Sequence, residues 1–288
     1  MTTNNNNNKQ MNLKEKIDHS IALIRKAEKL ALAMNDQGFH VGFSGGKDSQ
    51  VLLELVKMAG VKYRAVYNVT TNDPVENVRF IKEQYPDVIF DRPKQSFFQL
   101  VAKKGLPTQL HRFCCAILKE RAGIGFVTLT GVRAEESFKR SQYAEVRKWG
   151  NDKDKEIDLD KMEQAHFQCV GGKDKFMVYP ILQWTERDVW QFIRERGLPI
   201  NPCYATQKRV GCVFCPFAPK RQIIRQIKAK PKQYQALLHN LQKFLDNGDG
   251  RGQLNQLATA EEYFMWWINK ENIKTYMEKK QQTTIQFD

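Results

Sequence analysis

The sequence lacks the features that mark a membrane or secreted protein. No apolar run approaches the ~20 residues that a transmembrane helix requires, and residues 2–10 are polar instead of a charged segment followed by an apolar one. From both absences we expect a cytoplasmic protein with no membrane partner. Hydrophobic residues make up 41% of the 288 residues, so the chain carries enough apolar side chains to fold around a stable core.

Acidic side chains are absent from the stretch between Gly197 and Leu245, and the whole chain has a formal net charge of +14. Such one-sided charge attracts phosphate-rich partners. Within this stretch Arg221, Arg225 and Lys228 follow helical spacing, which places three cations on one helix face and predicts nucleic-acid-binding residues. The alternative is an ordinary basic face that keeps a helix soluble.

Strand and helix patterns alternate along most of the chain. Apolar runs predict strands at residues 39–43, 61–69, 88–90, 126–130 and 177–181. Helical periodicity predicts helices at residues 13–34, 74–84, 95–103, 112–121 and 185–196, and the apolar positions from Val51 to Met58 predict a further helix that stops at Gly60. The alternation predicts an α/β fold with a doubly wound parallel sheet, followed by a C-terminal helical region.

We expect three parts along the chain. Residues 1–11, which include an asparagine run, are predicted to be a disordered leader. Residues 12–217 are predicted to form a nucleotide-binding domain with a surface insertion at 147–175. Residues 218–288 are predicted to form the basic helical region, with breaks at Pro231 and at 248–252.

A loop with the sequence Ser-Gly-Gly-Lys-Asp-Ser, residues 44–49, joins the first predicted strand to a helix. Its backbone amides at a helix start can cradle phosphates, Lys47 adds a positive charge, and Ser44 and Ser49 add hydroxyl donors. Asp48 suits a bound Mg²⁺ or a helix cap. The loop is neither a P-loop, since position 41 is a valine, nor a dinucleotide fingerprint. A plain solvent-exposed Gly-Gly turn is the alternative.

These residues resemble the PP-loop ATP pyrophosphatase superfamily, and the rest of the chain resembles its phosphoadenosine-phosphosulfate (PAPS) reductase branch. Three further segments lie in family order: residues 131–140, residues 180–189 with the pattern P-x-x-x-W-T-x-x-D-V, and the Asn-Pro-x-Tyr element at 201–204. The resemblance implies an adenine nucleotide, ATP or PAPS/APS, with Mg²⁺. It implies catalytic roles for Lys47, Arg133 and Arg140. The implied nucleotide-binding residues are Ser44, Gly45, Gly46, Lys47, Asp48, Ser49, Gly131, Arg133 and Ser137.

Four of the six cysteines form two close pairs, Cys114-Cys115 and Cys212-x-x-Cys215. Without a secretion signal a disulfide framework is not expected, and four thiolates can close one metal site. The arrangement is similar to that of the [4Fe-4S] cluster in adenosine-phosphosulfate (APS) reductases, so the resemblance implies an iron-sulfur cluster. Zinc is the alternative metal, and four buried thiols acting as small hydrophobes are the alternative without metal. Cys203 is a further candidate redox thiol.

The chain departs at one point from the family that it resembles. Reductases of this branch are expected to attack sulfate with a cysteine near the C-terminus, but no cysteine follows Cys215. We therefore predict an enzyme of sulfur metabolism that activates or sulfurates an acceptor such as tRNA or DNA, with a thiol or sulfur donor protein as partner. One alternative is a PAPS/APS reductase that releases sulfite with an external thiol. The second is a non-enzymatic, nucleotide-sensing nucleic-acid-binding module.

Overall fold

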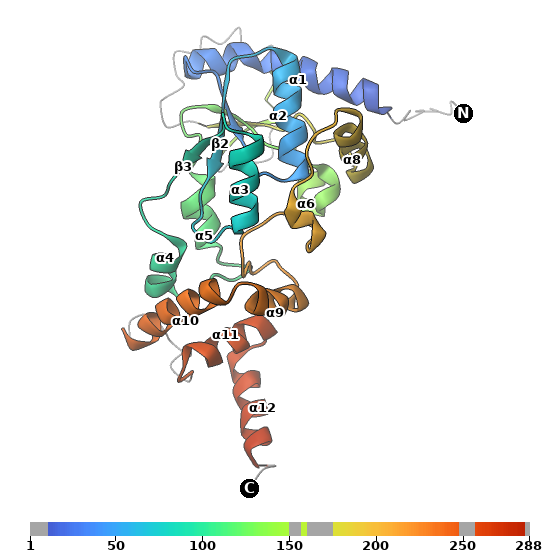
Figure 1. The fold of residues 1–288 in the computed structure, drawn as a ribbon. Helices are drawn as coiled ribbons and strands as arrows, with labels where there is room; N and C mark the ends of the chain where they lie inside the picture. Colours follow the sequence, from blue (N-terminus) through green and yellow to red (C-terminus); the bar gives the residue numbers. More distant parts are fainter. Residues whose placement is uncertain (1–10, 150–156, 160–174, 248–256, 286–288) are drawn as a thin grey trace, which may run out of the picture. The chain divides into compact units, whose positions relative to one another are not determined.

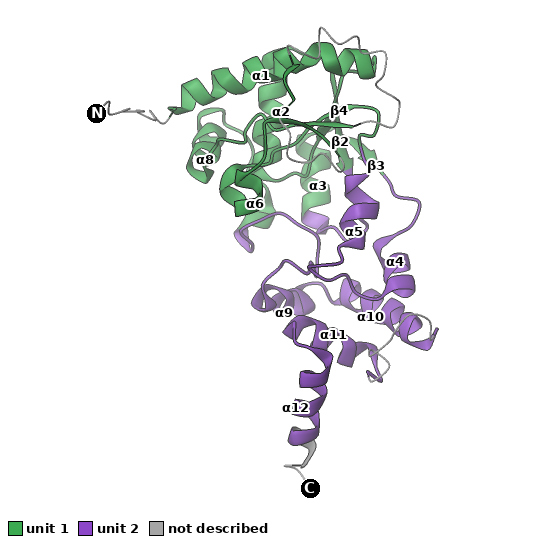
Figure 2. Cartoon of the chain, turned by 180° about the vertical axis from the view of Figure 1, so that it is seen from behind, with its two compact units in different colours: residues 1–67, 77–91, 123–204 green, residues 68–76, 92–122, 205–288 purple. Residues whose placement is uncertain are grey.

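The computed structural model describes residues 11–149, 157–159, 175–247 and 257–285. The chain divides into two compact units (Figure 2). Unit 1 comprises residues 1–67, 77–91 and 123–204, and unit 2 comprises residues 68–76, 92–122 and 205–288. Unit 2 thus draws on both sides of the boundary expected at residue 217, and the expected three-part division stays a prediction. The expected leader, most of the insertion and the break at 248–252 fall outside the described residues.

Unit 1 begins with helix α1, Leu13–Met34, whose bounds are those predicted from periodicity. A capping box fixes its start, because the side chain of Asn12 accepts a hydrogen bond from the Glu15 amide and the Glu15 carboxylate accepts one from the Asn12 amide. The apolar side of the helix includes the fully buried Ile24 and Ala27. This side packs against helix α2, Lys47–Ala59 (Figure 1).

The sheet of unit 1 has six strands in the order β3-β2-β1-β4-β6-β5. Their bounds are β1 Phe39–Gly42, β2 Tyr63–Asn68, β3 Ile89–Asp91, β4 Val127–Leu129, β5 Val146–Lys148 and β6 Phe176–Val178. Strand β1 pairs in parallel with β2 and β4, and β4 pairs in parallel with β6. The α/β class and the doubly wound parallel arrangement are confirmed.

The sequence prediction missed the edge strand β5, which runs antiparallel to β6 and occupies the expected start of the insertion. Strand β5 carries a charged side chain at its centre, so it gives no apolar run. The guanidinium of Arg147 lies 3.9 Å from the centre of the Tyr143 ring, and its Nε donates to Tyr179 Oη at 2.8 Å. Tyrosine rings thus bury a charge that the sequence pattern places at the surface.

Strand order reverses between β1 and β4. The chain leaves β1 through α2 to reach β2 on one side, and β4 joins the other side of β1 with Val41 opposite Leu129. At such a switch point the loops after both strands diverge and leave a crevice at their carboxyl ends. The loops at this position are residues 43–46, after β1, and residues 130–133, after β4.

Further helical elements of this part of the chain are α3 Val75–Gln84, the 3-10 turns Ala134–Glu136 and Pro202–Ala205, α6 Phe138–Ser141 and α8 Glu186–Glu195. The predicted Thr185 cap of α8 is confirmed, because its side chain accepts from the Asp188 amide at 3.2 Å in a capping box. Asp188 also accepts a hydrogen bond from the Lys16 ammonium at 2.5 Å, which ties α8 to α1.

Unit 2 is helical and confirms the predicted C-terminal helices. Its elements are α4 Phe97–Lys104, α5 Phe113–Cys115 with the π-helical turn Ala116–Glu120, α9 Lys220–Ala229, α10 Pro231–Asp246, α11 Ala260–Asn269 and α12 Ile273–Ile285. Helix α10 packs on α4, α9 and α11 around a core that includes Leu237, Leu241 and Phe264, each fully buried. Pro231, the predicted break, is the first residue of α10. No helix among the described residues is long and apolar enough to cross a membrane.

Candidate functional site

The Ser-Gly-Gly loop makes a tight turn directly after β1. Gly45 has φ +75°, a left-handed conformation that glycine adopts without steric cost. The hydroxyls of Ser44 and Ser49 lie 3.1 Å apart, and the Ser44 amide donates to Ser49 Oγ at 3.2 Å. Ser49 Oγ in turn donates to the Gly46 carbonyl at 2.8 Å. Both predicted serines therefore shape the loop from inside.

Two buried asparagines hold the loop carbonyls, and sequence reasoning assigned a role to neither. Asn201 Nδ2 donates to the Gly45 carbonyl at 2.8 Å and to Asn77 Oδ1 at 2.7 Å. Asn77 Nδ2 donates to the Ser44 carbonyl at 3.2 Å. Tyr204 Oη accepts from the Lys47 amide at 2.8 Å. The Asn-Pro-x-Tyr element thus supports the loop, whereas no local sequence signal marks Asn77.

Lys47 and Arg133 converge on the carboxylate of Asp48. Arg133 Nε donates to Asp48 Oδ1 at 2.7 Å, and Lys47 Nζ lies 3.3 Å from Asp48 Oδ2. Lys47 is 4% exposed and Arg133 is 3% exposed. Burial alone would lower the pKa of Arg133, but the Asp48 carboxylate and Glu135 raise it above its ordinary value. The structure therefore joins the two predicted cations at the switch point between β1 and β4.

The other residues of the 131–140 segment have supporting places. A Cβ on Gly131 would lie 2.8 Å from the Asp48 carbonyl oxygen, so glycine lets the chain after β4 approach the first turn of α2. Ser137 Oγ accepts from the Arg140 amide at 3.3 Å and caps α6. The Arg140 guanidinium pairs with Glu136, whose carboxylate also accepts from the Arg133 amide at 3.3 Å. Arg140 is thus linked to the loop through Glu136 and Arg133.

The first turn of α2 has no side-chain cap, since its N-cap residue is Gly46. The amides of Asp48 and Ser49 lie in that first turn, where the helix offers no carbonyl partner and favours an anion. Both oxygens of Asp48 already contact cations of this chain. In this arrangement the carboxylate orients Lys47 and Arg133, and its role toward Mg²⁺ stays a prediction.

The four paired cysteines all belong to unit 2, and all are free and partly buried. Electrostatic interactions connect Cys114 with Cys115 and Cys212, and Cys215 with Cys115 and Cys212. A hydrogen bond from Cys114 lowers the pKa of Cys115 to about 6, with help from Lys119, whereas burial raises the pKa of Cys215. The structure thus brings together two cysteine pairs that are far apart in the sequence.

The loop that carries Cys212 and Cys215 is held from both sides. Asn72 is only 1% exposed. Its backbone carbonyl accepts a hydrogen bond from the Val213 amide at 2.9 Å, and its side-chain Nδ2 donates one to the Val213 carbonyl at 2.5 Å. Phe214 has φ +51°, uncommon for a bulky residue, which turns the chain between the two cysteines.

Lys119, on the π-helical turn after Cys115, places Nζ 3.4 Å from Cys212 Sγ. Asn72 and Lys119 are functional candidates that sequence reasoning missed.

Among the described residues, no group of three or more His, Cys, Asp or Glu side chains is arranged to hold a metal ion. The donor set nevertheless has the right chemistry for a soft metal, because it consists of four thiols from one compact unit. A cluster of several iron atoms also spans more space than a single zinc ion, whose ligands must all lie ~2.3 Å from one point. The metal assignment of the four cysteines stays a prediction.

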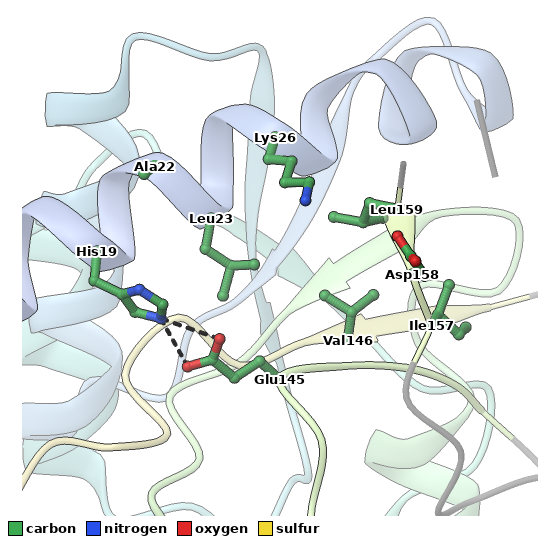
Figure 3. Close-up of a pocket in the computed structure, with 9 residues that line it drawn as sticks. All are labelled: His19, Ala22, Leu23, Lys26, Glu145, Val146, Ile157, Asp158 and Leu159. Carbon is green, nitrogen blue, oxygen red and sulfur yellow. Dashed lines mark hydrogen bonds and ion pairs between the residues drawn. The ribbon is translucent and has the colours of Figure 1, made fainter. Parts of the chain in front are cut away.

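A pocket of about 570 Å³ lies elsewhere in unit 1, between α1, β5 and residues 157–159 (Figure 3). Two of its lining residues form a hydrogen bond, with His19 Nε2 2.9 Å from Glu145 Oε1, and this bond raises the pKa of His19 although burial lowers it. None of the lining residues belongs to the loop 44–49 or to the segment 131–140. The pocket is therefore separate from the loop site.

Helix α9 in unit 2 exposes the three predicted nucleic-acid-binding residues. Arg221, Arg225 and Lys228 are all exposed, whereas Ile223 on the same helix is fully buried. The helical spacing inferred from the sequence is confirmed. Their role toward nucleic acid stays a prediction.

The fold and the loop together define a doubly wound α/β protein with a glycine loop and two buried cations at its switch point. Residues 38–218 match the phosphoadenosine phosphosulfate reductase domain, and the chain belongs to that family. The resemblance drawn from the ordered motifs is confirmed.

Relatives in the family include proteins of different length. Adenosine 5'-phosphosulfate reductase of Lysinibacillus sphaericus is 26% identical over 187 residues, which cover 60% of this chain and 70% of that protein. An uncharacterized protein of Methanocaldococcus jannaschii is 23% identical over 236 residues, 78% of this chain. The match spans 52% of that archaeal protein, about half of its length. Among solved structures, the PAPS reductase of Candida auris has a TM-score of 0.42 at 15% identity, covering 70% of this chain and 96% of that one.

Proposed function

We propose that the protein is an enzyme that binds an adenine nucleotide at the loop 44–49 and uses it to activate or sulfurate an acceptor. The observation that carries the proposal is the convergence of Lys47 and Arg133 on Asp48. In the free protein these two buried cations are balanced by the carboxylates of Asp48, Glu135 and Glu186. The uncapped first turn of α2 offers amides to a further anion beside them. This arrangement suits a phosphate chain better than a neutral ligand.

The chemistry on this proposal is an exchange at the α-phosphorus of ATP. An acceptor oxygen forms a new bond to the α-phosphorus, and the bond from that phosphorus to the bridging oxygen breaks, so that pyrophosphate leaves. Lys47 and Arg133 would stabilise the negative charge that develops on the phosphate oxygens, with the loop amides. Asp48 keeps both cations in place. No step requires a metal ligand from the loop.

The acceptor that we favour is a nucleic acid, tRNA or DNA. Support comes from the exposed Arg221, Arg225 and Lys228 on α9 and from the acid-free stretch around them. The four paired cysteines would hold an iron-sulfur cluster, which when bound supplies a soft site for sulfur. A thiol or sulfur donor protein would be the second partner.

The test is ATP-pyrophosphate exchange, measured with the purified protein alone and with added tRNA or single-stranded DNA. We expect exchange that rises when a nucleic acid is present, because the acceptor completes the reaction site. The alternative function, reduction of PAPS or APS, predicts sulfite release with thioredoxin and no exchange. Tight ATP binding without either activity would instead support the nucleotide-sensing module.

The cluster proposal has its own test. After anaerobic purification we expect a brown protein with a broad absorption shoulder in the visible range, and loss of that shoulder in a Cys212→Ser/Cys215→Ser variant. The matched control is Cys203→Ser, because Cys203 is buried in unit 1. A colourless wild-type protein that binds zinc at the same cysteines would overturn the iron-sulfur assignment.

A further inference from the structure

A second pocket, of about 360 Å³, lies within unit 2 at the carboxyl end of α11. Its walls include Leu110, Pro216, Trp266 and Trp267, with Lys270 and Glu271 beyond the end of the helix. The volume is at the small end of the range of ligand sites in proteins. Gln109 Nε2 donates to the Pro216 carbonyl at 3.0 Å and so fixes one wall directly beside Cys215.

The two tryptophans offer the pocket aromatic carbon surface and no free polar group. Trp267 Nε1 donates to the Pro107 carbonyl at 2.7 Å, and Trp266 Nε1 donates to the Glu271 carbonyl at 3.0 Å. Both indole N–H groups are thus used inside the protein. Leu110, 91% exposed, adds apolar surface at the rim. Surfaces of this kind favour a flat, apolar-faced ligand.

One buried acceptor in the pocket residues has no partner. Glu271 Oε1 pairs with Lys279 Nζ at 3.0 Å, whereas Glu271 Oε2 is buried and accepts no hydrogen bond from the described part of the chain. Leaving such an oxygen without a donor is unfavourable. The Glu271 side chain is 30% exposed and lines the pocket, so a ligand with N–H donors can meet its carboxylate there, while a phosphate group would be repelled by the same carboxylate.

The surroundings of the pocket are cationic. Lys270 is exposed next to it. Lys220, the first residue of α9, donates to Asn269 Oδ1 at 2.6 Å, so the basic helix begins beside the end of α11. A ligand with a neutral, flat, N–H-bearing group on a negatively charged chain therefore fits both the pocket and its surroundings.

We propose that this pocket binds one unpaired base of a single-stranded nucleic acid, stacked on the tryptophan surface with its amino or imino N–H donating to Glu271. The inference rests on the proposed function only for the class of acceptor, and it assigns the recognition of that acceptor to unit 2. The phosphates that flank the base would meet Lys270 and the exposed cations of α9. Stacking of a base on an aromatic side chain is tolerant of sequence, and the carboxylate adds a preference for bases with N–H donors.

The test uses fluorescein-labelled single-stranded oligonucleotides and fluorescence anisotropy with the full chain. One set carries cytosines, the matched set carries abasic positions with the same phosphates, and both are made as DNA and as RNA. We expect the abasic set to bind ~10-fold more weakly than the cytosine set. The DNA and RNA arms identify which sugar the site accepts.

Glu271→Ala separates base recognition from general electrostatics. Loss of a negative charge by itself strengthens the binding of a polyanion, as we expect for the matched control Glu278→Ala on the exposed side of α12. The pocket proposal predicts the opposite sign, with ~10-fold weaker binding of the cytosine set by Glu271→Ala and no weakening of the abasic set. Trp266→Leu, which keeps an apolar side chain, should also weaken binding of the cytosine set selectively.

Several outcomes would overturn the inference. The first is equal affinity of the protein for the abasic and cytosine sets. The second is binding of the cytosine set by Glu271→Ala that is no weaker than its binding by Glu278→Ala. The third is that no oligonucleotide binds. Pyrophosphate exchange with wild-type protein keeps the two proposals apart. Exchange that rises with nucleic acid but with no base-dependent binding removes only the pocket, whereas base-dependent binding without exchange removes only the proposed reaction.

Discussion

Lys47→Ala is expected to reduce affinity for ATP by ~10- to 150-fold while the protein stays folded. The substitution removes the ammonium that lies 3.3 Å from Asp48 Oδ2 at the start of α2. A charge-assisted hydrogen bond contributes ~1.5–3 kcal/mol, which corresponds to ~10- to 150-fold in affinity. The fold should survive because Asp48 keeps its contact with Arg133. Isothermal titration calorimetry measures the affinity, and circular dichroism checks the fold.

The matched control is Lys57→Ala, in the last turn of the same helix. Lys57 is exposed and its removal changes the net charge of the protein by the same amount. We expect ATP affinity within about twofold of wild type, since an exposed charge at this distance is screened. Equal affinity in wild type and Lys47→Ala would contradict the placement of the nucleotide at this loop.

Gly45→Ala is expected to destabilise the protein by ~3 kcal/mol and to abolish ATP binding. The backbone of Gly45 has φ +75°, and a Cβ there would lie 2.4 Å from Asn77 Oδ1 and 2.9 Å from Ile81 Cγ1. A left-handed alanine costs ~1–2 kcal/mol, and overpacking a tight interior costs ~1–3 kcal/mol more. Both Asn77 and Ile81 are buried, so neither can move aside easily. Urea unfolding gives the free energy of unfolding.

Gly60→Ala separates the two contributions. Gly60 follows α2 with φ +70°, close to that of Gly45, but a Cβ there would meet nothing within 4 Å. We therefore expect a loss of only ~1 kcal/mol, with ATP binding unchanged. Equal destabilisation by the two substitutions would mean that the contact with Asn77 does not constrain the loop.

The parts of the fold that sequence predicted best have strong local signals. The predicted bounds of α1 are those observed, because an apolar face and a capping box act within the same segment. Strand β5 could not be predicted, since its central Arg147 is buried by aromatic rings from distant residues. The π-helical turn at 116–120 was predicted as ordinary helix, because a change in hydrogen-bond register leaves no mark on hydrophobic periodicity.

The candidate sites divide in the same way. Lys47 stood out because it is a charged residue in a glycine loop at a helix start, and Arg133 stood out because its segment resembles a motif of the family. Asn77 and Asn72 did not, because a buried asparagine acts through contacts with residues far away in the sequence. Such residues are identified by asking which side chain accepts or donates for each buried backbone group.

The carboxylate of Asp48 has a consequence for how a ligand enters. On the proposed function it holds the place of the phosphate in the free protein, because it gives the buried Lys47 and Arg133 a counterion. The cations are consequently set in position while the chain folds, and an arriving nucleotide meets a preorganised site that needs little further ordering. Asp48 also sets a threshold for binding, because a ligand gains binding free energy from Lys47 and Arg133 only when it displaces the Asp48 carboxylate from them. A triphosphate meets that threshold more readily than a ligand with a single negative charge.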